Sequence, residues 1–401
     1  MSHAVRYPTV SLKPRREGPL LAGHLWVFSG AIQHLSRPAE AGAIVDVRTG
    51  EGAYLGRGYY HPQTDIAVRL LTRQPDEAID VAFLRRAVRQ AAALRQAFDP
   101  DRTNAFRLIN AEGDYLPGVI VDDYAGYLVV QISTAGMERL REPFLQALAE
   151  EMQPRGILLR NDAGSRAREG LARGAPEVAY GEVPEQIEIR EHGLRFLVDP
   201  RLGQKTGFFL DQRDKRLALQ KYAAGRRVLN CFSYTSAFGV YAAVTSPETH
   251  VTSVDVSESA LEAARANFAL NGLDPARHAF IAQDVFEYLE AASAGGERYN
   301  VVILDPPAFA KSQGARSQAL RAYRRLNTLG MQVLSPGGIL LSCSCSGVIG
   351  QDDLLGAIAQ SAQRVERPVQ LLEVYGHGFD HAINLSMPET AYLKAIFFRV
   401  A

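Results

Sequence analysis

Polar side chains follow a series of short apolar runs in the second half of the chain. Residues 228–231 lead into a turn of small and aromatic residues, and aspartates end the runs before Val256, Val285 and Pro306. A Ser-Cys-Ser-Cys-Ser segment follows the run at 339–341. In open α/β sheets, ligands bind outside the carboxyl ends of the strands. Five such strand ends, separated by helix-like segments, therefore predict one ligand site.

The first of these strand ends predict a site for a nucleoside sulfonium cofactor, S-adenosylmethionine. This cofactor needs close approach of the backbone, a carboxylate for the ribose hydroxyls and a flat slot for adenine. The turn at 230–236 suits the first need, Asp255 the second, and Asp284 with the amide of Val285 the third. A dinucleotide fingerprint would need three glycines, and this turn has none before Gly239. In the alternative interpretation, Asp255 is the N-cap of a helix that starts near residue 257.

The Asp305-Pro306-Pro307 segment predicts a rigid carboxylate beside a planar base. Proline fixes its own φ angle and favours an extended residue before it, so Asp305 is held at its strand end. The other interpretation is a loop between a strand and a helix, with Asp305 as a capping residue.

Cys345 determines which reaction we expect. Carbon 5 of a pyrimidine is a poor nucleophile until a thiolate adds to carbon 6 and activates it. Asp305, if protonated or bridging, would then hydrogen-bond N3 of a cytosine and draw electrons from the ring. Within a strand, Cys343 and Cys345 share a face. Periodicity alone therefore leaves both thiols open as the nucleophile.

The balance of charge gives no sign of a nucleic acid, because 44 basic residues offset 44 acidic ones. Local clusters are more informative, since they would attract phosphates. One lies within the first 37 residues and another between 311 and 325. For each cluster, a solvated face is the other interpretation. The residues predicted to bind RNA are Arg15, Arg16, Lys311, Arg316, Arg321, Arg324 and Arg325.

Several classes of protein are disfavoured by composition. Three cysteines are too few for a disulfide framework, and their spacing matches no zinc site, so we expect free thiols and no metal. No apolar stretch approaches the roughly 20 residues that span a bilayer. The first 14 residues contain no apolar signal core. We therefore expect a cytoplasmic protein without a membrane partner.

The chain divides into three predicted segments. Residues 1–73 alternate short apolar runs with turns, as in a small β-barrel. Residues 74–192 form an α+β module, and residues 193–401 alternate strand and helix, which favours a doubly wound, mostly parallel sheet. The elements predicted in the central module are helices at 81–98 and 138–152, a hairpin of 115–122 with 127–132, and strands at 157–159 and 187–189. Four arginines of this module would face a phosphate backbone or lie exposed in loops: Arg160, Arg166, Arg168 and Arg173.

These residues together resemble the bacterial class I S-adenosylmethionine-dependent large-subunit ribosomal RNA cytosine-C5 methyltransferases that begin with a PUA domain. Residues 24–32 resemble the family's PUA opening, and 205–213 resemble its loop before the catalytic sheet. Residues 229–235 are similar to its donor-binding motif and 344–347 to its catalytic cysteine motif. The resemblance covers essentially the whole chain. It implies a multidomain fold with an N-terminal PUA β-barrel, a central α+β RNA-binding module and a C-terminal Rossmann-like methyltransferase domain.

The resemblance also selects among the candidate residues. It implies that Cys345, with Asp305, is catalytic and that Cys343 is not. Ser236 stands where the family often has glycine, so a slightly tighter donor pocket is expected. The residues expected to bind the donor are Lys205, Thr206, Gly207, Asn230, Phe232, Ser233, Tyr234, Thr235, Asp255, Val256, Asp284, Val285, Asp305 and Pro306. Residues 307–309 lack the second cysteine of other RNA cytosine-C5 methyltransferases, which leaves the proton-abstracting base unassigned.

Three functions follow from these observations. The favoured one is methylation of carbon 5 of a cytosine in 23S ribosomal RNA or a large-subunit precursor. The second is methylation of an exocyclic base nitrogen, with Cys345 structural. The third is a non-catalytic RNA-binding or assembly protein. The target nucleotide stays open, as does the oligomeric state, for which a homodimer is one option.

Overall fold

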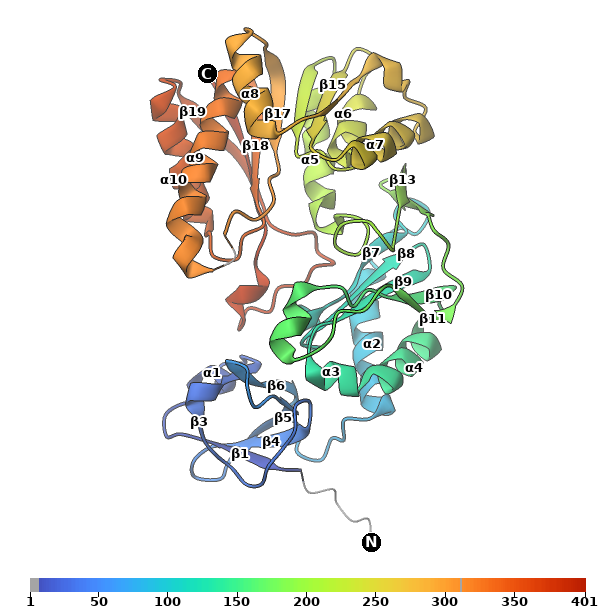
Figure 1. Ribbon diagram of the computed structural model, residues 1–401, viewed down its shortest axis with the longest axis vertical. Coiled ribbons are helices and arrows are strands. Elements are labelled where there is room, and N and C mark those ends of the chain that lie inside the picture. Colours follow the sequence, from blue (N-terminus) through green and yellow to red (C-terminus); the bar gives the residue numbers. More distant parts are fainter. Residues whose placement is uncertain (1–6, 311) are drawn as a thin grey trace. The chain divides into compact units, whose positions relative to one another are not determined.

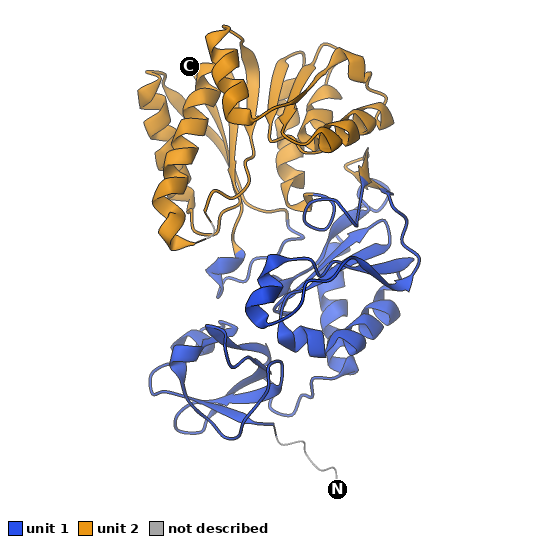
Figure 2. Ribbon diagram, in the orientation of Figure 1, with its two compact units in different colours: residues 1–187, 198–208, 379–390 blue, residues 188–197, 209–378, 391–401 orange. Residues whose placement is uncertain are grey.

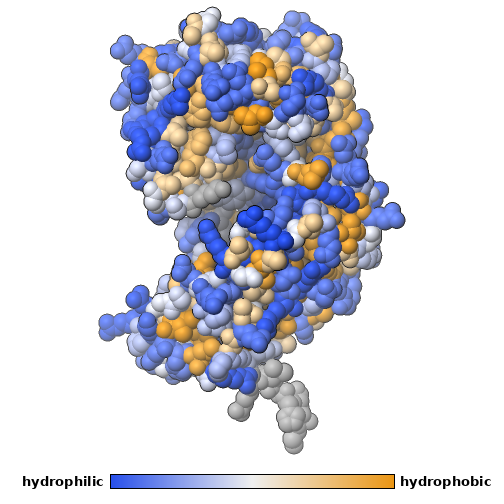
Figure 3. All heavy atoms as spheres, in the orientation of Figure 1, coloured by the Kyte–Doolittle hydropathy of each residue, from blue (hydrophilic) through white to orange (hydrophobic). Residues whose placement is uncertain are grey.

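The computed structural model describes residues 7–310 and 312–401, which fall into two compact units (Figures 1 and 2). Unit 1 comprises residues 1–187, 198–208 and 379–390, and unit 2 comprises 188–197, 209–378 and 391–401. Within the described residues, no helix is both long and apolar enough to cross a membrane. On the face drawn in Figure 3, hydrophobic residues form small patches among hydrophilic ones. Each unit is described by itself below.

Unit 1 begins with a six-stranded sheet in the order β2-β6-β5-β4-β1-β3. Its strands are β1 (Thr9–Leu12), β2 (Trp26–Phe28), β3 (Ile32–Leu35), β4 (Ile44–Arg48), β5 (Tyr54–Tyr60) and β6 (Ile66–Thr72), with the short helix α1 (Gly18–Leu21) after β1. β1 pairs parallel with β4, and the other pairs are antiparallel. Alternating apolar residues such as Val10, Val45 and Val68 fill its core because neighbouring strand residues face opposite sides. This is the β-structure predicted for the first 73 residues.

The second sheet of unit 1 has five strands, ordered β11-β10-β9-β8-β7, and packs against helices. Its strands are β7 (Ala105–Asn110), β8 (Val119–Tyr124), β9 (Tyr127–Ile132), β10 (Gly156–Leu159) and β11 (Glu177–Gly181), and its helices are α2 (Val81–Arg95), α3 (Ala135–Arg139) and α4 (Arg141–Met152). β8 and β9 form the predicted hairpin. The helix predicted over 138–152 is broken at Leu140, which has a non-helical backbone and separates α3 from α4. Phe83 and Val88 of α2 and Phe144 and Leu148 of α4 join the core of this sheet.

Four arginines of the central module were predicted either to face a phosphate backbone or to lie exposed in loops. Two of them do neither, because they are buried. Arg160 and Arg166 are each 5% exposed. Arg160 donates to the carbonyls of Pro200 and Gly203, and Arg166 donates to the carbonyl of Ala172 and to Glu138. Both interpretations were therefore wrong for this pair, because the guanidinium groups satisfy buried carbonyl oxygens instead. Arg168 and Arg173 are exposed.

Unit 2 contains a seven-stranded sheet in the order β16-β15-β14-β17-β18-β20-β19. Its strands are β14 (Arg227–Cys231), β15 (His250–Asp255), β16 (Ala279–Ala282), β17 (Tyr299–Leu304), β18 (Leu334–Ser344), β19 (Val369–Tyr375) and β20 (Lys394–Val400). Its helices are α5 (Arg213–Ala223), α6 (Ala237–Ala243), α7 (Glu258–Leu270), α8 (Val285–Ala294), α9 (Arg316–Gln332) and α10 (Gln351–Arg364). The first five strands along the chain are parallel, as predicted, and β20 pairs antiparallel with β18 and β19.

The order of strands places a switch point beside β14. The chain runs outward from β14 through β15 to β16, then returns to the other side of β14 and continues through β17 to β18. Ligands of such sheets bind where the strand order reverses, outside the carboxyl ends. The residues that follow β14, β15, β17 and β18 are therefore brought to one edge. A two-stranded sheet of β12 (Ile187–Glu191) and β13 (Leu194–Val198) precedes this region.

Candidate active site

The turn after β14 has an unusual backbone held by buried polar contacts. Phe232, Tyr234 and Ser236 all have positive φ angles, of 56°, 48° and 53°. Non-glycine residues seldom adopt this left-handed conformation, and such strain collects at functional sites. The Ser236 hydroxyl lies 2.7 Å from that of Ser253 and accepts a hydrogen bond from Asn230 at 3.2 Å. The extra side chain at Ser236 therefore points into the protein, where Asn230 and Ser253 hold it.

Two other hydroxyl groups of this turn lack internal partners. Ser233 Oγ and Thr235 Oγ1 are buried, and neither has a hydrogen-bond partner among the residues that the structure describes. Buried polar groups are nearly always satisfied by protein, water or a ligand, so these two hydroxyl groups at a strand end are available to a polar ligand. A polar cofactor lying along this turn fits that observation.

Asp255 ties the turn to the next strand end. One carboxylate oxygen accepts from the amide of Tyr234 at 2.8 Å, and the other from the amide of Ser257 at 3.0 Å. The N-cap of α7 is Ser257, whose hydroxyl accepts from the amide of Ala260. The alternative interpretation of Asp255 as the N-cap was therefore wrong. Val256 beside it is 72% exposed, which leaves apolar surface at this strand end.

Asp284 does cap a helix. Its side chain accepts from the amides of Phe286 and Glu287 at the start of α8, at 2.8 and 3.2 Å. Asp284 is exposed, whereas Val285 is buried against the core of the sheet. Helix capping accounts for one oxygen of Asp284 and leaves the other carboxylate oxygen for a different contact.

Asp305 follows β17 and is held by a residue that the sequence alone did not single out. Gln212, in the short turn Leu210–Gln212, donates its amide to Asp305 Oδ1 at 2.9 Å. Gln212 is 3% exposed. The two residues are 93 positions apart, so no spacing rule could have connected them. The next helical segments are a short 3-10 helix at Gln313–Ala315, whose N-cap residue is Ser312, and α9, which begins at Arg316, so Asp305 is the N-cap of neither.

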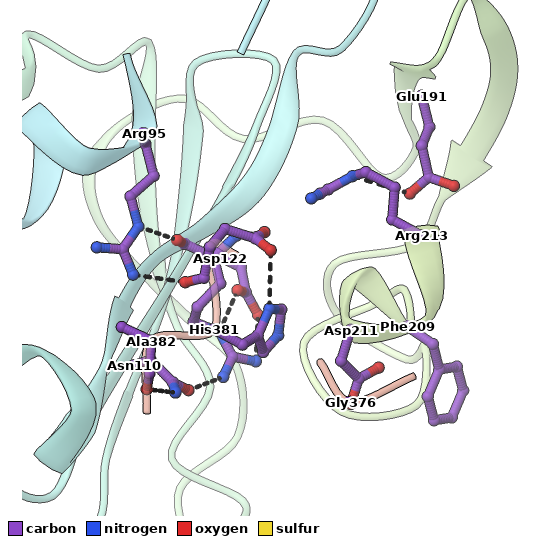
Figure 4. A network of polar contacts seen from close by, with 12 residues as sticks. Arg95, Asn110, Asp122, Glu191, Phe209, Asp211, Arg213, Gly376, His381 and Ala382 are labelled. Carbon is purple, nitrogen blue, oxygen red and sulfur yellow. Dashed lines mark hydrogen bonds and ion pairs between the residues drawn. The ribbon is translucent and has the colours of Figure 1, made fainter. Parts of the chain in front are cut away.

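The segment with Gln212 is itself anchored inside unit 2. Arg216 makes two hydrogen bonds of 2.7 Å to the Glu191 carboxylate and one of 3.0 Å to the carbonyl of Phe209. Figure 4 shows Arg213 beside the same carboxylate, with Nε 3.4 Å from Glu191. Burial alone would raise the pKa of Glu191, but the two arginines outweigh it and lower that pKa. The ring of Phe209 packs edge-on against Tyr234 with centroids 5.4 Å apart, so the segment that holds Asp305 also contacts the turn after β14.

The three cysteines have different surroundings. Cys231 and Cys343 are fully buried, and burial raises the pKa of each thiol. Cys345 is partly exposed and lies just beyond the end of β18. The expectation that it shares a face with Cys343 applies only within a strand, so it does not extend to Cys345. Its neighbours are fixed: Ser344 accepts from Tyr323 at 2.8 Å, and Ser346 donates to the carbonyl of Ala310 at 2.7 Å. Cys345 is thus the accessible thiol beside the strand end that carries Asp305.

Residues 205–207, the part of the predicted 205–213 loop that was expected to bind the donor, belong to unit 1 and have partners there. Thr206 is 1% exposed, lies 2.8 Å from the Tyr124 hydroxyl and donates to Asp122. Lys205 is exposed with a φ of 54°, and Gly207 has a φ of 136°. The Thr206 hydroxyl is therefore used within unit 1.

The basic residues predicted to contact RNA fall into two groups. Arg15 and Arg16 are exposed in unit 1. On α9, Arg316 pairs with Asp353, Arg324 donates to Gln360 at 2.8 Å, Arg325 pairs with Glu290 at 2.6 Å, and Arg321 is exposed. Lys311 lies outside the described residues. The α9 arginines lie on the solvent side because Tyr323, Leu326 and Gly330 occupy the buried face.

Comparison with known families decides the class of this site. Residues 166–399 match the family described as S-adenosylmethionine-dependent methyltransferase. The chain belongs to this family. Residues 10–73 match a PUA-like domain, in agreement with the six-stranded sheet of unit 1. Within the part of the chain that is described, no cluster of three or more His, Cys, Asp or Glu side chains could hold a metal ion.

Individual relatives narrow the family further. This methyltransferase is 41% identical over 386 residues to ribosomal RNA large subunit methyltransferase I of Serratia proteamaculans, covering 96% of this chain and 97% of that one. The same identity and coverage hold for the protein of that name from Yersinia pestis. Among solved structures, SMU.776 complexed with S-adenosylhomocysteine superposes with a TM-score of 0.85 at 25% identity, over 98% of this chain and all of that one. A protein from Streptococcus mutans described as a SAM-dependent methyltransferase gives 0.84 at the same identity and coverage.

The methyltransferase therefore has S-adenosylmethionine as its cofactor, and the turn after β14 has features that suit it. The strained backbone at 232–236, the unpaired Ser233 and Thr235 hydroxyls and the carboxylate of Asp255 lie within one turn and the adjoining strand end. These groups would receive the polar parts of the nucleoside and amino acid, while Val256 offers apolar surface.

Proposed function

We propose that this protein methylates carbon 5 of a cytosine in large-subunit ribosomal RNA, through a covalent adduct with Cys345. The relatives that it matches over nearly its whole length are named ribosomal RNA large subunit methyltransferase I. The observation that carries the chemistry is the accessible thiol of Cys345 beside the strand end that presents Asp305. An exocyclic amine needs no thiol for methyl transfer, whereas carbon 5 does.

In the proposed reaction, the Cys345 thiolate adds to carbon 6 of the cytosine, and the new S–C bond makes carbon 5 nucleophilic. Carbon 5 would then take the methyl group of S-adenosylmethionine, whose S–CH3 bond breaks as the new C–C bond forms and which leaves as S-adenosylhomocysteine. A base removes the proton from carbon 5, and the electron pair of that C–H bond re-forms the ring double bond as the thiolate leaves. Asp305, one oxygen of which accepts from Gln212, would in its protonated form donate a hydrogen bond to N3 of the ring and so withdraw electron density. The base that takes the final proton stays unassigned.

The donor would be held by the residues around the β14 turn. In this proposal, residues 230 and 232–235 line the methionine and ribose side, Asp255 binds the ribose hydroxyls, and Asp284 with the amide of Val285 binds the adenine edge. Pro306 fixes Asp305 beside the reacting groups. Residues 205–207 are proposed to contribute through the backbone and Lys205, since the Thr206 hydroxyl already has internal partners.

RNA would be bound by basic surface outside the catalytic sheet. We propose that residues 1–73 and 74–192 serve as RNA-binding parts and that residues 193–401 transfer the methyl group. Exposed Arg15 and Arg16 and the surface arginines of α9 supply positive charge for phosphates.

A pair of alanine variants tests this function. Cys345→Ala should abolish methyl transfer to ribosomal RNA while the protein still binds S-adenosylhomocysteine and RNA, because it removes the nucleophile and little volume. Cys343→Ala is the matched control, two residues earlier and fully buried, and should keep substantial activity. If Cys345→Ala still methylates at a near-normal rate, the exocyclic-nitrogen reaction replaces this proposal. If wild-type protein fails to bind S-adenosylhomocysteine, a non-catalytic assembly role replaces both.

A further inference from the structure

Lys394 spans the short stretch of chain that contains Cys345. It is the first residue of β20 and lies opposite Ser344, the last residue of β18, in the antiparallel pairing. From there its ammonium group donates to the carbonyl of Ser346 at 2.8 Å and to that of Tyr392 at 3.1 Å. Cys345 lies between the two residues that Lys394 meets on this side. The side chain of Lys394 therefore holds residues 344–346, the segment that contains Cys345, in place.

The lysine also interacts with the thiol electrostatically. Lys394 is half-buried, and burial lowers the pKa of its ammonium group, while the charges of Cys345 and Asp353 act in the opposite direction. Interaction between two ionisable groups is mutual, so the ammonium group favours the thiolate form of Cys345. A thiolate near a lysine is the usual basis of a reactive cysteine.

Other charged groups face the same region from neighbouring elements. The hydroxyl of Tyr323 on α9 interacts electrostatically with Cys345, Asp305 and Cys343. Asp353, which interacts with Lys394, lies in the first turn of α10. The two carboxylates would oppose a thiolate. Lys215 of α5 donates to the carbonyls of Asp211 and Gly376, and the thiol with which it interacts is Cys343. Lys394 thus brings positive charge to Cys345 in surroundings that also hold carboxylates.

We propose that Lys394 is a positioning residue that holds the 344–346 segment and stabilises the thiolate of Cys345 before substrate binds. This inference rests on the proposed function, in which Cys345 is the nucleophile. It assigns to this chain's own lysine a part of the activation that would otherwise fall to the sulfonium of the bound donor.

Alkylation of the full-length protein by iodoacetamide, without donor or RNA, measures the thiolate directly. The thiolate sulfur displaces iodide, so an S–C bond forms, a C–I bond breaks and the thiol proton passes to the buffer. The rate is followed against pH, with the modified Cys345 peptide quantified by mass spectrometry. We expect a wild-type midpoint below about 8.5, the value of an ordinary cysteine. A wild-type midpoint at or above about 8.5 overturns the inference without any variant.

Two substitutions separate the effect of the positive charge of Lys394 from that of its hydrogen bonds to the two carbonyls. Lys394→Gln keeps a donor for the carbonyls but removes the charge, and should raise the midpoint by about one pH unit, the size that a neighbouring opposite charge produces. Lys394→Arg keeps the charge and should leave the midpoint near the wild-type value. Lys221→Gln is the control, because Lys221 is exposed and pairs with Glu373.

An unchanged midpoint in Lys394→Gln, with the variant still binding S-adenosylhomocysteine, contradicts the inference. If Lys394→Gln does not fold, the wild-type midpoint and that of Lys394→Arg decide the matter. The proposed function fails separately, when Cys345→Ala keeps its methylation activity. A shifted midpoint together with an active Cys345→Ala protein would remove Lys394 from catalysis as well.

Discussion

The five-stranded sheet of unit 1 and the carboxyl edge of the seven-stranded sheet in unit 2 use aspartates in opposite ways. In unit 1, Arg95 makes two hydrogen bonds to Asp114, of 2.7 and 2.6 Å, and Arg107 pairs with the fully buried Asp122. Figure 4 shows Arg95 and Asp122 within this network. In unit 2, Asp255 and Asp284 are held by backbone amides.

The difference separates structural carboxylates from those able to bind a ligand. A carboxylate paired with a buried guanidinium has its charge and most of its hydrogen-bonding capacity already used. A carboxylate held by one or two backbone amides is oriented, and its remaining lone pairs can accept from a ribose hydroxyl. The same residue type therefore stabilises the fold in one sheet and is available for chemistry at the edge of the other.

The largest effect is expected from breaking a unit 1 pair. Arg107→Ala leaves Asp122 buried without its cation and should lower the free energy of unfolding by about 3–5 kcal/mol. Urea unfolding followed by the fluorescence of Trp26, the single tryptophan and a residue of unit 1, measures this loss. Arg321→Ala, at an exposed site on α9, should change it by no more than about 0.5 kcal/mol. A loss below about 1 kcal/mol for Arg107→Ala would mean that the pair is not structural.

Asp123, next to Asp122, should give stability an unusual pH dependence. Burial raises the pKa of its carboxyl to about 7, with Asp122 acting in the same direction. Because this value exceeds the unfolded value of about 3.9, the protonated form stabilises the fold, and that contribution is lost as pH rises from about 4 through 7. Asp123→Asn retains an oxygen for the amide of Gly126 and should stabilise unit 1 above pH 7 by at most about 4 kcal/mol. Identical pH profiles for the two proteins, measured by Trp26 fluorescence in urea, would rule this out.

Asp255→Ala should weaken donor binding and leave RNA affinity nearly unchanged. Loss of a charged acceptor for the ribose hydroxyls costs roughly 1.5–3 kcal/mol. Calorimetric titration with S-adenosylhomocysteine measures the change. Asp274→Ala is a suitable control, because Asp274 also accepts from a backbone amide but lies before β16, at the opposite edge of the sheet. If Asp255→Ala bound the donor normally and lost RNA binding, the ribose-binding role proposed for Asp255 would be wrong.

The smallest effect should come from the surface of α9. Replacing Arg321, Arg324 and Arg325 together with glutamine should lower RNA affinity and flatten its dependence on salt, because each phosphate contact releases counterions. The slope of log affinity against log salt should fall in magnitude by about 2–3 if all three contact phosphates. Filter binding over a salt series measures it. An unchanged slope would make this face of α9 ordinary solvated surface.

Much of the architecture could be predicted because the decisive signals are local. Alternating apolar runs predicted the N-terminal sheet, and polar residues after buried strands predicted the edge at β14, β15 and β17. The hydrogen bonds of Arg160 to the carbonyl of Pro200 and of Arg166 to that of Ile132 could not be predicted, since no sequence spacing specifies them. The same holds for residues 379–390, which join unit 1 through contacts such as that of Asp380 with the amide of Arg107, 273 residues away. Gln212 and Lys394 could not be predicted for the same reason, because each hydrogen-bonds a residue far away in the sequence, Asp305 and Ser346 respectively.

Trapping the covalent adduct tests the central claim most directly. Ribosomal RNA carrying 5-fluorocytosine should form a complex with the wild-type protein that survives denaturant, because fluorine at carbon 5 blocks the final proton abstraction and the thiolate cannot leave. The complex should require S-adenosylmethionine, should form with Cys343→Ala and should be absent with Cys345→Ala. Methylation of unmodified RNA without any such complex, or a complex that persists in Cys345→Ala, would contradict a covalent mechanism through Cys345.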